Sequence, residues 1–89
     1  MVTIPLNSTM SLVDIADCDA VIDMALAAYD FPIVFDCVAA TGIDSMVIDY
    51  IIKTWRRAEE GGDVEVINAD DLTQETLDLV GVSRLVKVM

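Results

Sequence analysis

The sequence contains no histidine and only two cysteines, and these absences exclude several common kinds of chemistry. Without histidine, the chain lacks the side chain that most often acts as a general base near neutral pH. Cys18 and Cys37 do not form a CxxC pair, so we expect neither a zinc site nor a thioredoxin-type redox site. The prediction is therefore a chain with no metal, no cofactor and no catalytic residue, whose thiols are buried in a reducing compartment.

Basic residues are also scarce, since five Lys plus Arg stand against 16 Asp plus Glu, for a formal net charge of −11. Proteins that bind nucleic acid cluster Lys and Arg to neutralise phosphates. The one cluster here, Lys53, Arg56 and Arg57, lies beside Glu59 and Glu60 with the spacing of a solvated helix face. We therefore expect no nucleic-acid partner. The acidity is typical of a high-salt host, and equally of a docking surface for a basic partner.

Long apolar runs are missing as well. No run approaches the roughly 20 residues that a membrane-spanning helix needs, and no basic segment followed by an apolar block opens the chain. We therefore expect a cytoplasmic protein with no direct membrane insertion. At 89 residues and 55% hydrophobic content, the chain is expected to form one small domain over residues 1–89 with a packed core.

Apolar periodicity predicts strands that alternate with helices. The order β-α-β-α-β-α-β favours an α/β fold with right-handed crossovers, a mostly parallel or mixed four-stranded sheet and three main helices. The first helix has an apolar stripe that includes Val21, Ile22 and Tyr29. Asp71 is the expected N-cap of the last helix, and Gly81 follows its end. The predicted elements are strand 2–6, helix 12–29, strand 33–36, helix 44–60 stopped by Gly61 and Gly62, strand 64–67, helix 71–80 and strand 85–88.

The carboxyl ends of the strands are where open α/β sheets usually carry their functional residues. This rule selects Asp36, Cys37 and the loop that leads to Asp44 and Ser45. Ser45 would lie at a helix N-terminus, where free N–H groups and the helix dipole favour an anion such as a phosphate. Asp and Ser are also ordinary capping residues, so on spacing alone capping is the alternative role of both.

Five segments in a fixed order carry a resemblance to a known family. They are Val34–Asp36, Ile43–Ser45, Trp55–Gly62, Val64–Asn68 and Leu77–Val82. Together they resemble a STAS domain, the family of the bacterial anti-sigma factor antagonists. The likeness covers about Ile33 to the end of the chain. It is weaker before Leu12, because the family usually opens with an additional strand that is missing here.

The resemblance implies a non-enzymatic signalling module that takes part in transcription regulation. In the antagonists, a Ser or Thr at the start of this helix is phosphorylated by an anti-sigma factor that is also a serine kinase. The dephosphorylated form binds that partner and frees sigma. By this resemblance Ser45 is the phosphorylated residue, and the expected partner-binding residues are Asp36, Asp44, Ser45, Met46 and Asp49. Tyr50, on the same helix, is a further candidate for facing the partner.

Three alternatives remain open. The common antagonist pattern is Asp-Ser-Ser/Thr-Gly-Leu with the second hydroxyl as acceptor, so aligning the aspartates places Met46 at the acceptor position, whereas aligning Gly61 and Gly62 places Ser45 there. We favour Ser45. An unphosphorylated STAS adaptor of a chemosensory or lipid-transporting ABC system is the second alternative. The third, a small α/β enzyme using Asp36, Cys37 or Ser45, lacks a histidine base, a Gly-rich phosphate loop and a metal cluster.

The absent first strand also bears on oligomeric state. It leaves the edge near residues 2–6 open to pairing with another strand. We therefore predict that a homodimer forms through this edge.

Overall fold

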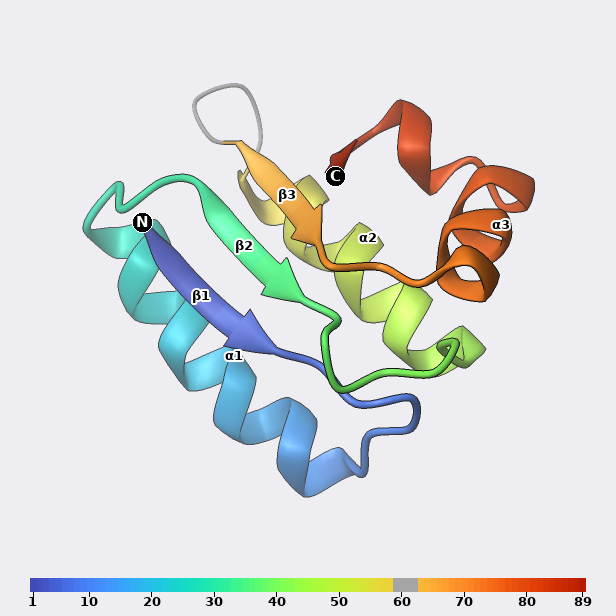
Figure 1. Cartoon of the computed structure of the whole chain (residues 1–89). Coiled ribbons are helices and arrows are strands. Elements are labelled where there is room, and N and C mark those ends of the chain that lie inside the picture. The colour runs from blue at the N-terminus through green and yellow to red at the C-terminus, as the bar shows by residue number, and fades with distance from the viewer. Residues whose placement is uncertain (59–62) are drawn as a thin grey trace.

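The alternation of strands and helices that the sequence predicts is confirmed by a computed structural model, which describes residues 1–58 and 63–89. The main elements are shown in Figure 1. In chain order they are β1 (Val2–Pro5), α1 (Leu12–Ala27), β2 (Ile33–Asp36), α2 (Ser45–Ala58), β3 (Val64–Ile67), α3 (Asp71–Leu79), the short 3-10 helix η2 (Val82–Arg84) and β4 (Lys87–Val88).

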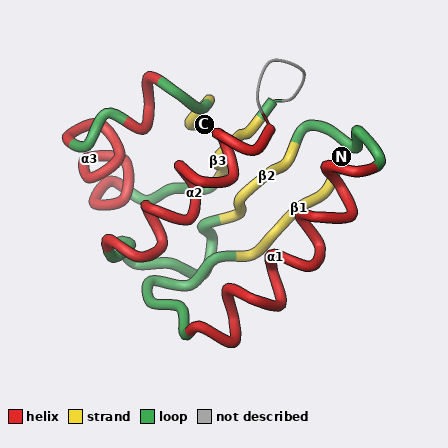
Figure 2. The backbone as a smooth tube through the Cα atoms, turned by 180° about the vertical axis from the view of Figure 1, so that it is seen from behind, coloured by secondary structure: helices red, strands yellow, loops and turns green. Residues whose placement is uncertain are grey.

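The sheet is parallel throughout. Within the described residues its four strands lie in the order β1-β2-β3-β4, and each pairs in parallel with the next. Because consecutive strands are neighbours, right-handed crossovers place every connecting helix on the same face of the sheet. Seen from behind, α1 and α2 lie side by side in front of the strands, with α3 beyond α2 (Figure 2).

The core lies between this face of the sheet and the helices. Ile4, Phe35 and Val66 are in register on adjacent strands, and all three are buried. They meet buried residues of α1 and α2 such as Ile22 and Ile51. Burial of the core side chains provides most of the driving force for folding, and each fully buried large aliphatic or aromatic side chain contributes about 1.5–3 kcal/mol.

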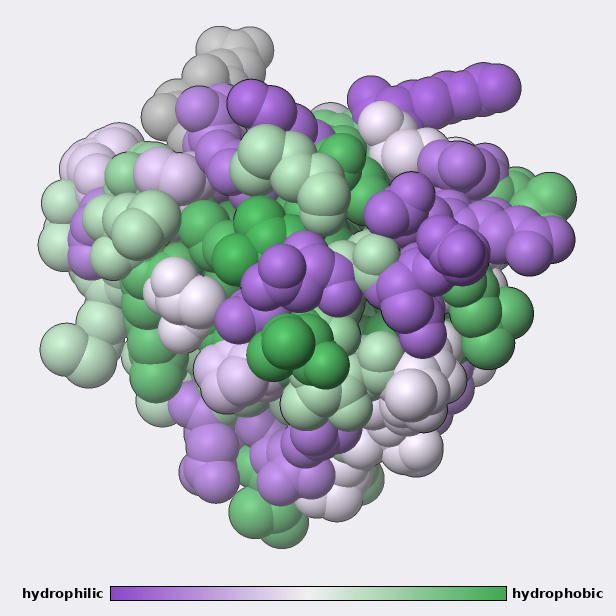
Figure 3. Space-filling view, in the orientation of Figure 1, coloured by the Kyte–Doolittle hydropathy of each residue, from purple (hydrophilic) through white to green (hydrophobic). Residues whose placement is uncertain are grey.

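The opposite face of the sheet faces the viewer in Figure 1, and no helix of residues 1–58 or 63–89 covers it. Side chains alternate along a strand, so this face carries the row Thr3, Val34, Glu65 and Lys87, which are in register. Green and purple residues are intermingled over it in Figure 3. Val34 is only 4% exposed even so, so β2 is buried on both faces.

Two predicted helix ends are wrong. The first helix ends at Ala27 rather than Tyr29, because Tyr29 takes a left-handed φ of 52° that turns the chain out of the helix. Its side chain is 80% exposed and does not extend the buried stripe, and Val21 is exposed as well. In α3 the N-cap is Asp70 and not Asp71, since the Asp70 carboxylate accepts the Thr73 N–H at 2.8 Å.

The end of the chain also differs from the prediction. Gly81 follows α3 with a left-handed φ of 82°, as expected of a residue just past a helix. The segment then forms η2, so the last strand is limited to Lys87 and Val88 instead of residues 85–88. Glu59 to Gly62, the predicted end of the second helix, lie outside the described residues. In the described part of the chain no helix is long and apolar enough to cross a membrane.

β1 lies at one edge of the sheet. The N–H groups of Val2 in β1 and of Leu6, just after it, donate to the carbonyls of Pro32 and Asp36 on the β2 side. In a parallel strand alternate residues turn their peptide groups to opposite sides, so Thr3 and Pro5 face the free edge. Because proline has no N–H, this edge has few donors for another strand. The homodimer through this edge stays a prediction, and Pro5 weighs against it.

Candidate functional site

The β2–α2 loop places the start of α2 at the carboxyl-terminal edge of the sheet. Asp44 is the N-cap, because its Oδ1 accepts the Val47 N–H at 3.0 Å and its carbonyl accepts the Ile48 N–H at 3.1 Å. The loop is fastened to the β1–α1 turn through Ser8. The Ser8 carbonyl accepts the Asp44 N–H at 3.1 Å, and its hydroxyl oxygen accepts the Thr41 N–H at 2.9 Å.

Ser45 is the first residue of α2, and its side chain is exposed. Its hydroxyl makes no hydrogen bond within residues 1–58 and 63–89, and in the same residues the Ser45 and Met46 N–H groups find no acceptor. Such unpaired donors are usual in the first turn of a helix and carry its positive partial charge. Ser45 therefore combines an accessible hydroxyl with two donors that can bind an anion.

Met46 and Asp49 lie on the first turns of the same helix and share a hollow. Met46 is 44% exposed, and Asp49 pairs with Lys53 at 3.5 Å, one helical turn further on. Both line a cavity of about 250 Å³ between α1 and α2, together with Leu12, Ile15, Tyr50 and Lys53. Four of the five predicted partner-binding residues, 44, 45, 46 and 49, thus lie together at the start of α2.

Asp36, the fifth predicted partner-binding residue, is held by a different set of contacts. Its Oδ1 accepts the Val38 N–H at 3.0 Å and the Asn68 side-chain amide at 3.0 Å. The carboxylate therefore ties the end of β2 to the end of β3, where Asn68 takes a left-handed φ of 57°. In the described residues no hydrogen bond joins Asp36 to Asp44 or Ser45. Its contacts are those of a residue that shapes the loop.

The thiols are poorly suited to nucleophilic chemistry. Cys37 is buried, and burial, with the nearby carboxylates of Asp36 and Asp70, raises its pKa to about 11. Cys18 is partly buried, and burial followed by the charges of neighbouring aspartates on α1 raises its pKa as well. Since the thiolate is the reactive form, both residues stay protonated and unreactive near neutral pH. In the part of the chain described, no three His, Cys, Asp or Glu residues are grouped so as to hold a metal ion.

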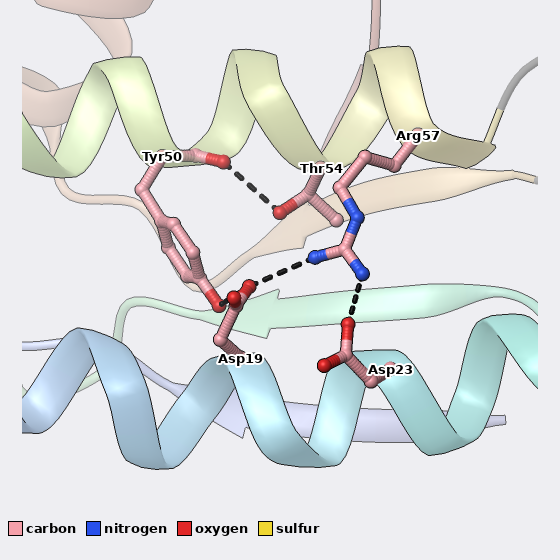
Figure 4. A network of polar contacts seen from close by, with 5 residues as sticks. All are labelled: Asp19, Asp23, Tyr50, Thr54 and Arg57. Carbon is pink, nitrogen blue, oxygen red and sulfur yellow. Dashed lines mark hydrogen bonds and ion pairs between the residues drawn. The ribbon is translucent and has the colours of Figure 1, made fainter.

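A polar network between α1 and α2 is the feature that sequence reasoning missed (Figure 4). Arg57 of α2 donates from Nη1 to Asp19 at 2.9 Å and from Nη2 to Asp23, both on α1. The Tyr50 hydroxyl donates to the same Asp19 oxygen at 3.4 Å. The i, i+4 spacing of the two aspartates is visible in the sequence, but their partner on another helix is not.

This network involves two residues that the sequence analysis singles out. Arg57 does not belong to a purely solvated basic face, because two carboxylates of α1 hold it in place. Tyr50 is largely buried; its ring packs edge-on against Phe35 with centroids 6.0 Å apart, and the side chain also lines the cavity beside Met46. Burial, then the charge of Asp19, raises the pKa of Tyr50 above its ordinary value.

Comparison with protein families bears on the whole chain. The family model of the STAS domain matches residues 1–89. The chain belongs to the STAS domain family. The match includes the segment before Leu12, where the likeness read from the sequence is weaker. A search of the curated proteins found no match. Membership of this family makes the chain a protein-interaction module with an α/β fold.

Proposed function

We propose that this STAS domain is a non-catalytic cytoplasmic signalling module of the anti-sigma factor antagonist kind. In this proposal it binds a partner that is an anti-sigma factor and serine kinase, and phosphorylation of Ser45 switches the binding off. The observation that carries the proposal is the exposed Ser45 hydroxyl on the first residue of α2. A serine kinase can phosphorylate only a hydroxyl group that its active site can reach.

Capping by Asp44 strengthens the case for Ser45. A serine at a helix start is often there to cap the helix, and its hydroxyl is then engaged. Here the Asp44 carboxylate accepts the Val47 N–H and fills that role. The Ser45 hydroxyl is therefore not needed for the helix, which leaves it available for modification.

The expected switch is electrostatic. A phosphoserine adds roughly −1.5 to −2 charges near pH 7. The free N–H groups of Ser45 and Met46 and the helix dipole would stabilise this phosphate in the unbound protein. In the complex the phosphate, next to the carboxylates of Asp44 and Asp49, would be buried against partner groups that have lost their hydration. Like charges and desolvation would then weaken binding without a change of fold.

Met46 supports a second candidate function. It is partly exposed and lies next to Ser45, at the position where an alignment on the aspartates would place the acceptor. A methionine cannot be phosphorylated, so that alignment favours an unswitched STAS adaptor of a chemosensory or lipid-transporting ABC system. Both candidates require a protein partner, and only the first requires a phosphate on Ser45.

Mass spectrometry of the chain from its own cells separates the two. We expect intact masses of the wild type, recovered under growth and under stress without phosphatase activity, to include a phosphorylated form, and fragmentation to place the phosphate on Ser45. The Ser45→Ala variant should lose this form, whereas Ser83→Ala, in η2, should keep it. A phosphate on another residue, or none under either condition, would overturn the switch and leave the adaptor.

A further inference from the structure

The outer side of α1 is apolar although it faces solvent. A surface helix normally carries polar and charged residues on this side. In α1 the residues there are apolar at every third or fourth position, and all are exposed: Val13, Ala16, Ala20, Met24 and Ala27. In the view of Figure 2, α1 lies in front of the sheet with no other described element over it. We call these five residues the α1 outer face.

The α1 outer face is separate from the sides of the helix that are used inside the domain. Ile22 and Ala25 are buried in the core, and Asp19 and Asp23 hold Arg57 of α2. At 3.6 residues per turn, the five residues of the outer face lie within a sector of roughly 80° on the opposite side from Ile22. An exposed apolar surface that the fold does not use is typical of a protein-binding site.

The spacing on this face is symmetric about Ala20, and the side-chain sizes are complementary. Val13 and Ala27 are each seven positions from Ala20, and Ala16 and Met24 are each four positions from it. In each of these two pairs, one side chain is large and the other is an alanine. A two-fold axis at Ala20 would therefore place every large side chain of one helix against an alanine of an antiparallel copy. In a parallel pair each residue would meet its own copy, which leaves gaps between the alanines.

We propose that the α1 outer face binds the same face of a second copy of this chain. The two helices would run antiparallel across a two-fold axis at Ala20. Both copies contribute the same patch to such a contact, so the patch must be complementary to itself. Val13 would pack on Ala27 of the other copy, and Met24 on Ala16. Exposures of 70% for Val13 and 75% for Met24 leave these side chains free to make the contact.

Local charge permits this contact in spite of the acidity of the chain. Asp19 and Asp23 are already paired with Arg57. Asp17 lies at the margin of the face and has no ion pair within residues 1–58 and 63–89. In the antiparallel pair the two Asp17 residues would lie about 9 Å apart along the helix axis, which is about one Debye length at physiological salt. The net charge of −11 on each copy opposes association over a longer range, so salt should strengthen the dimer.

The size of the face sets the strength of the contact. α1 has 16 residues and is therefore about 24 Å long. A strip about 10 Å wide along it covers about 240 Å² on each copy, well below the roughly 800 Å² of a standard interface. We therefore expect a weak, reversible dimer with a Kd of about 0.1–1 mM.

Two other occupants fit the face less well. A lipid surface attracts amphipathic helices that are rich in Lys and Arg, and α1 has neither. A charged partner protein is not selected either, since Asp17 is the one unpaired acid beside the face in the described residues. The symmetric order about Ala20 has no use in a contact with a different protein. The inference goes beyond the proposed function and does not depend on phosphorylation of Ser45.

Sedimentation equilibrium of the purified chain up to about 1 mM tests the proposal. We expect a monomer–dimer equilibrium that tightens between about 0.1 M and 1 M salt. Ala20→Glu should weaken dimerisation at least about tenfold, because it places two carboxylates against each other at the two-fold axis. Ala39→Glu is the matched control, since it adds the same charge at an exposed alanine of the β2–α2 loop. It should change the dimerisation constant by less than about twofold, and circular dichroism checks that both variants are folded.

Disulfide cross-linking tests the antiparallel register. A mixture of Ala16→Cys and Met24→Cys chains should form a cross-linked heterodimer under mild oxidation, because the two positions face each other. Either variant alone should not cross-link, since its two cysteines would lie about 12 Å apart along the helix axis, beyond the reach of a disulfide. The wild type, with Cys18 and Cys37 in place, is the control for the native thiols.

Four results would overturn the inference. A monomer at about 1 mM in high salt would leave the face to a different protein or to lipid. Equal losses for Ala20→Glu and Ala39→Glu would mean that net charge alone controls association. Cross-linking of either cysteine variant by itself would contradict the antiparallel pair. Concentration-dependent NMR shifts at Thr3 and not at Ala20 would move the contact to the β1 edge. Each result is independent of whether Ser45 is phosphorylated, so failure of the dimer and failure of the switch are distinguishable.

Discussion

Arg57 in the last turn of α2 donates from Nη1 to the Asp19 carboxylate of α1 across 2.9 Å, although the two residues are 38 positions apart in the chain. Its Nη2 donates to Asp23, one turn along α1. Hydrogen bonding to Asp23 is the main reason why the pKa of Arg57 is raised, and the charges of both aspartates add to it. One guanidinium thus joins the two helices that line the cavity.

Replacement of Arg57 by glutamine should destabilise the domain. Ion pairs as exposed as these contribute roughly 0.2–1 kcal/mol each, so we expect a loss of about 1 kcal/mol for the two together. The loss should shrink at high salt, because salt screens exposed charges. Urea denaturation of the wild type and the variant at low and high salt measures both effects.

Arg84→Gln is the control for this prediction, since it removes the same charge from an exposed residue of η2. We expect it to change stability by less than about 0.5 kcal/mol. Equal losses for the two variants would show that net charge, and not the contact with α1, sets the stability.

Two glycines with left-handed backbone angles should differ in their tolerance of alanine. Gly81 has φ 82° and open space around it, whereas a Cβ on Gly42, at φ 84°, would lie 2.9 Å from Cδ2 of Leu72 in α3. The left-handed angle alone costs an alanine roughly 1–2 kcal/mol. We expect Gly81→Ala to lose about this amount and Gly42→Ala to lose more, as measured by thermal denaturation.

A second substitution separates strain from crowding. Leu72 is exposed, so Leu72→Ala should cost little by itself. Combined with Gly42→Ala it should restore the part of the loss that comes from the close contact, and combined with Gly81→Ala it should restore nothing. Simple additivity in both pairs would contradict this account.

Cys37 should make the domain less stable at alkaline pH. Its pKa is raised from the ordinary 9.0 to about 11 in the folded protein, chiefly by burial. The unfolded thiol therefore loses its proton before the folded one does. The stability that this residue contributes is fully present below about pH 9 and is lost as the pH rises towards about 11. Near neutral pH the thiol should react slowly with a disulfide reagent.

Urea denaturation at pH 8 and pH 10.5 checks this prediction in the wild type and in Cys37→Ala. The pKa of Tyr50 is raised too, so both proteins should weaken at high pH. The free energy of unfolding of the wild type should fall further than that of the variant, by about 2 kcal/mol. A shift of roughly two pKa units sets the upper limit of this difference, which is not reached because the titration is still incomplete at pH 10.5. An equal fall in the two proteins would show that Cys37 does not contribute.

The start of α2 shows what periodicity and helix signals can predict. Alternation of short apolar runs with amphipathic segments predicts the strand and helix order, because burial on one face imposes a local repeat on the sequence. The same rules place Asp36 at a strand end and Asp44 and Ser45 at a helix start. They do not decide which of the two caps the helix. That choice depends on the backbone path of the loop, which Ser8 of a different turn helps to fix.

By itself the sequence determined the α/β class, the order of the elements, the family likeness and the acidity of the surface, since each depends on residues near one another in the chain or on composition. Only the tertiary structure decided that Tyr50 is buried, that Arg57 binds Asp19 and Asp23, and that Leu12 and Met46 line one cavity. Those contacts join α1 to α2. Their geometry depends on how the two helices lie on the sheet, and no local repeat in the sequence records that arrangement.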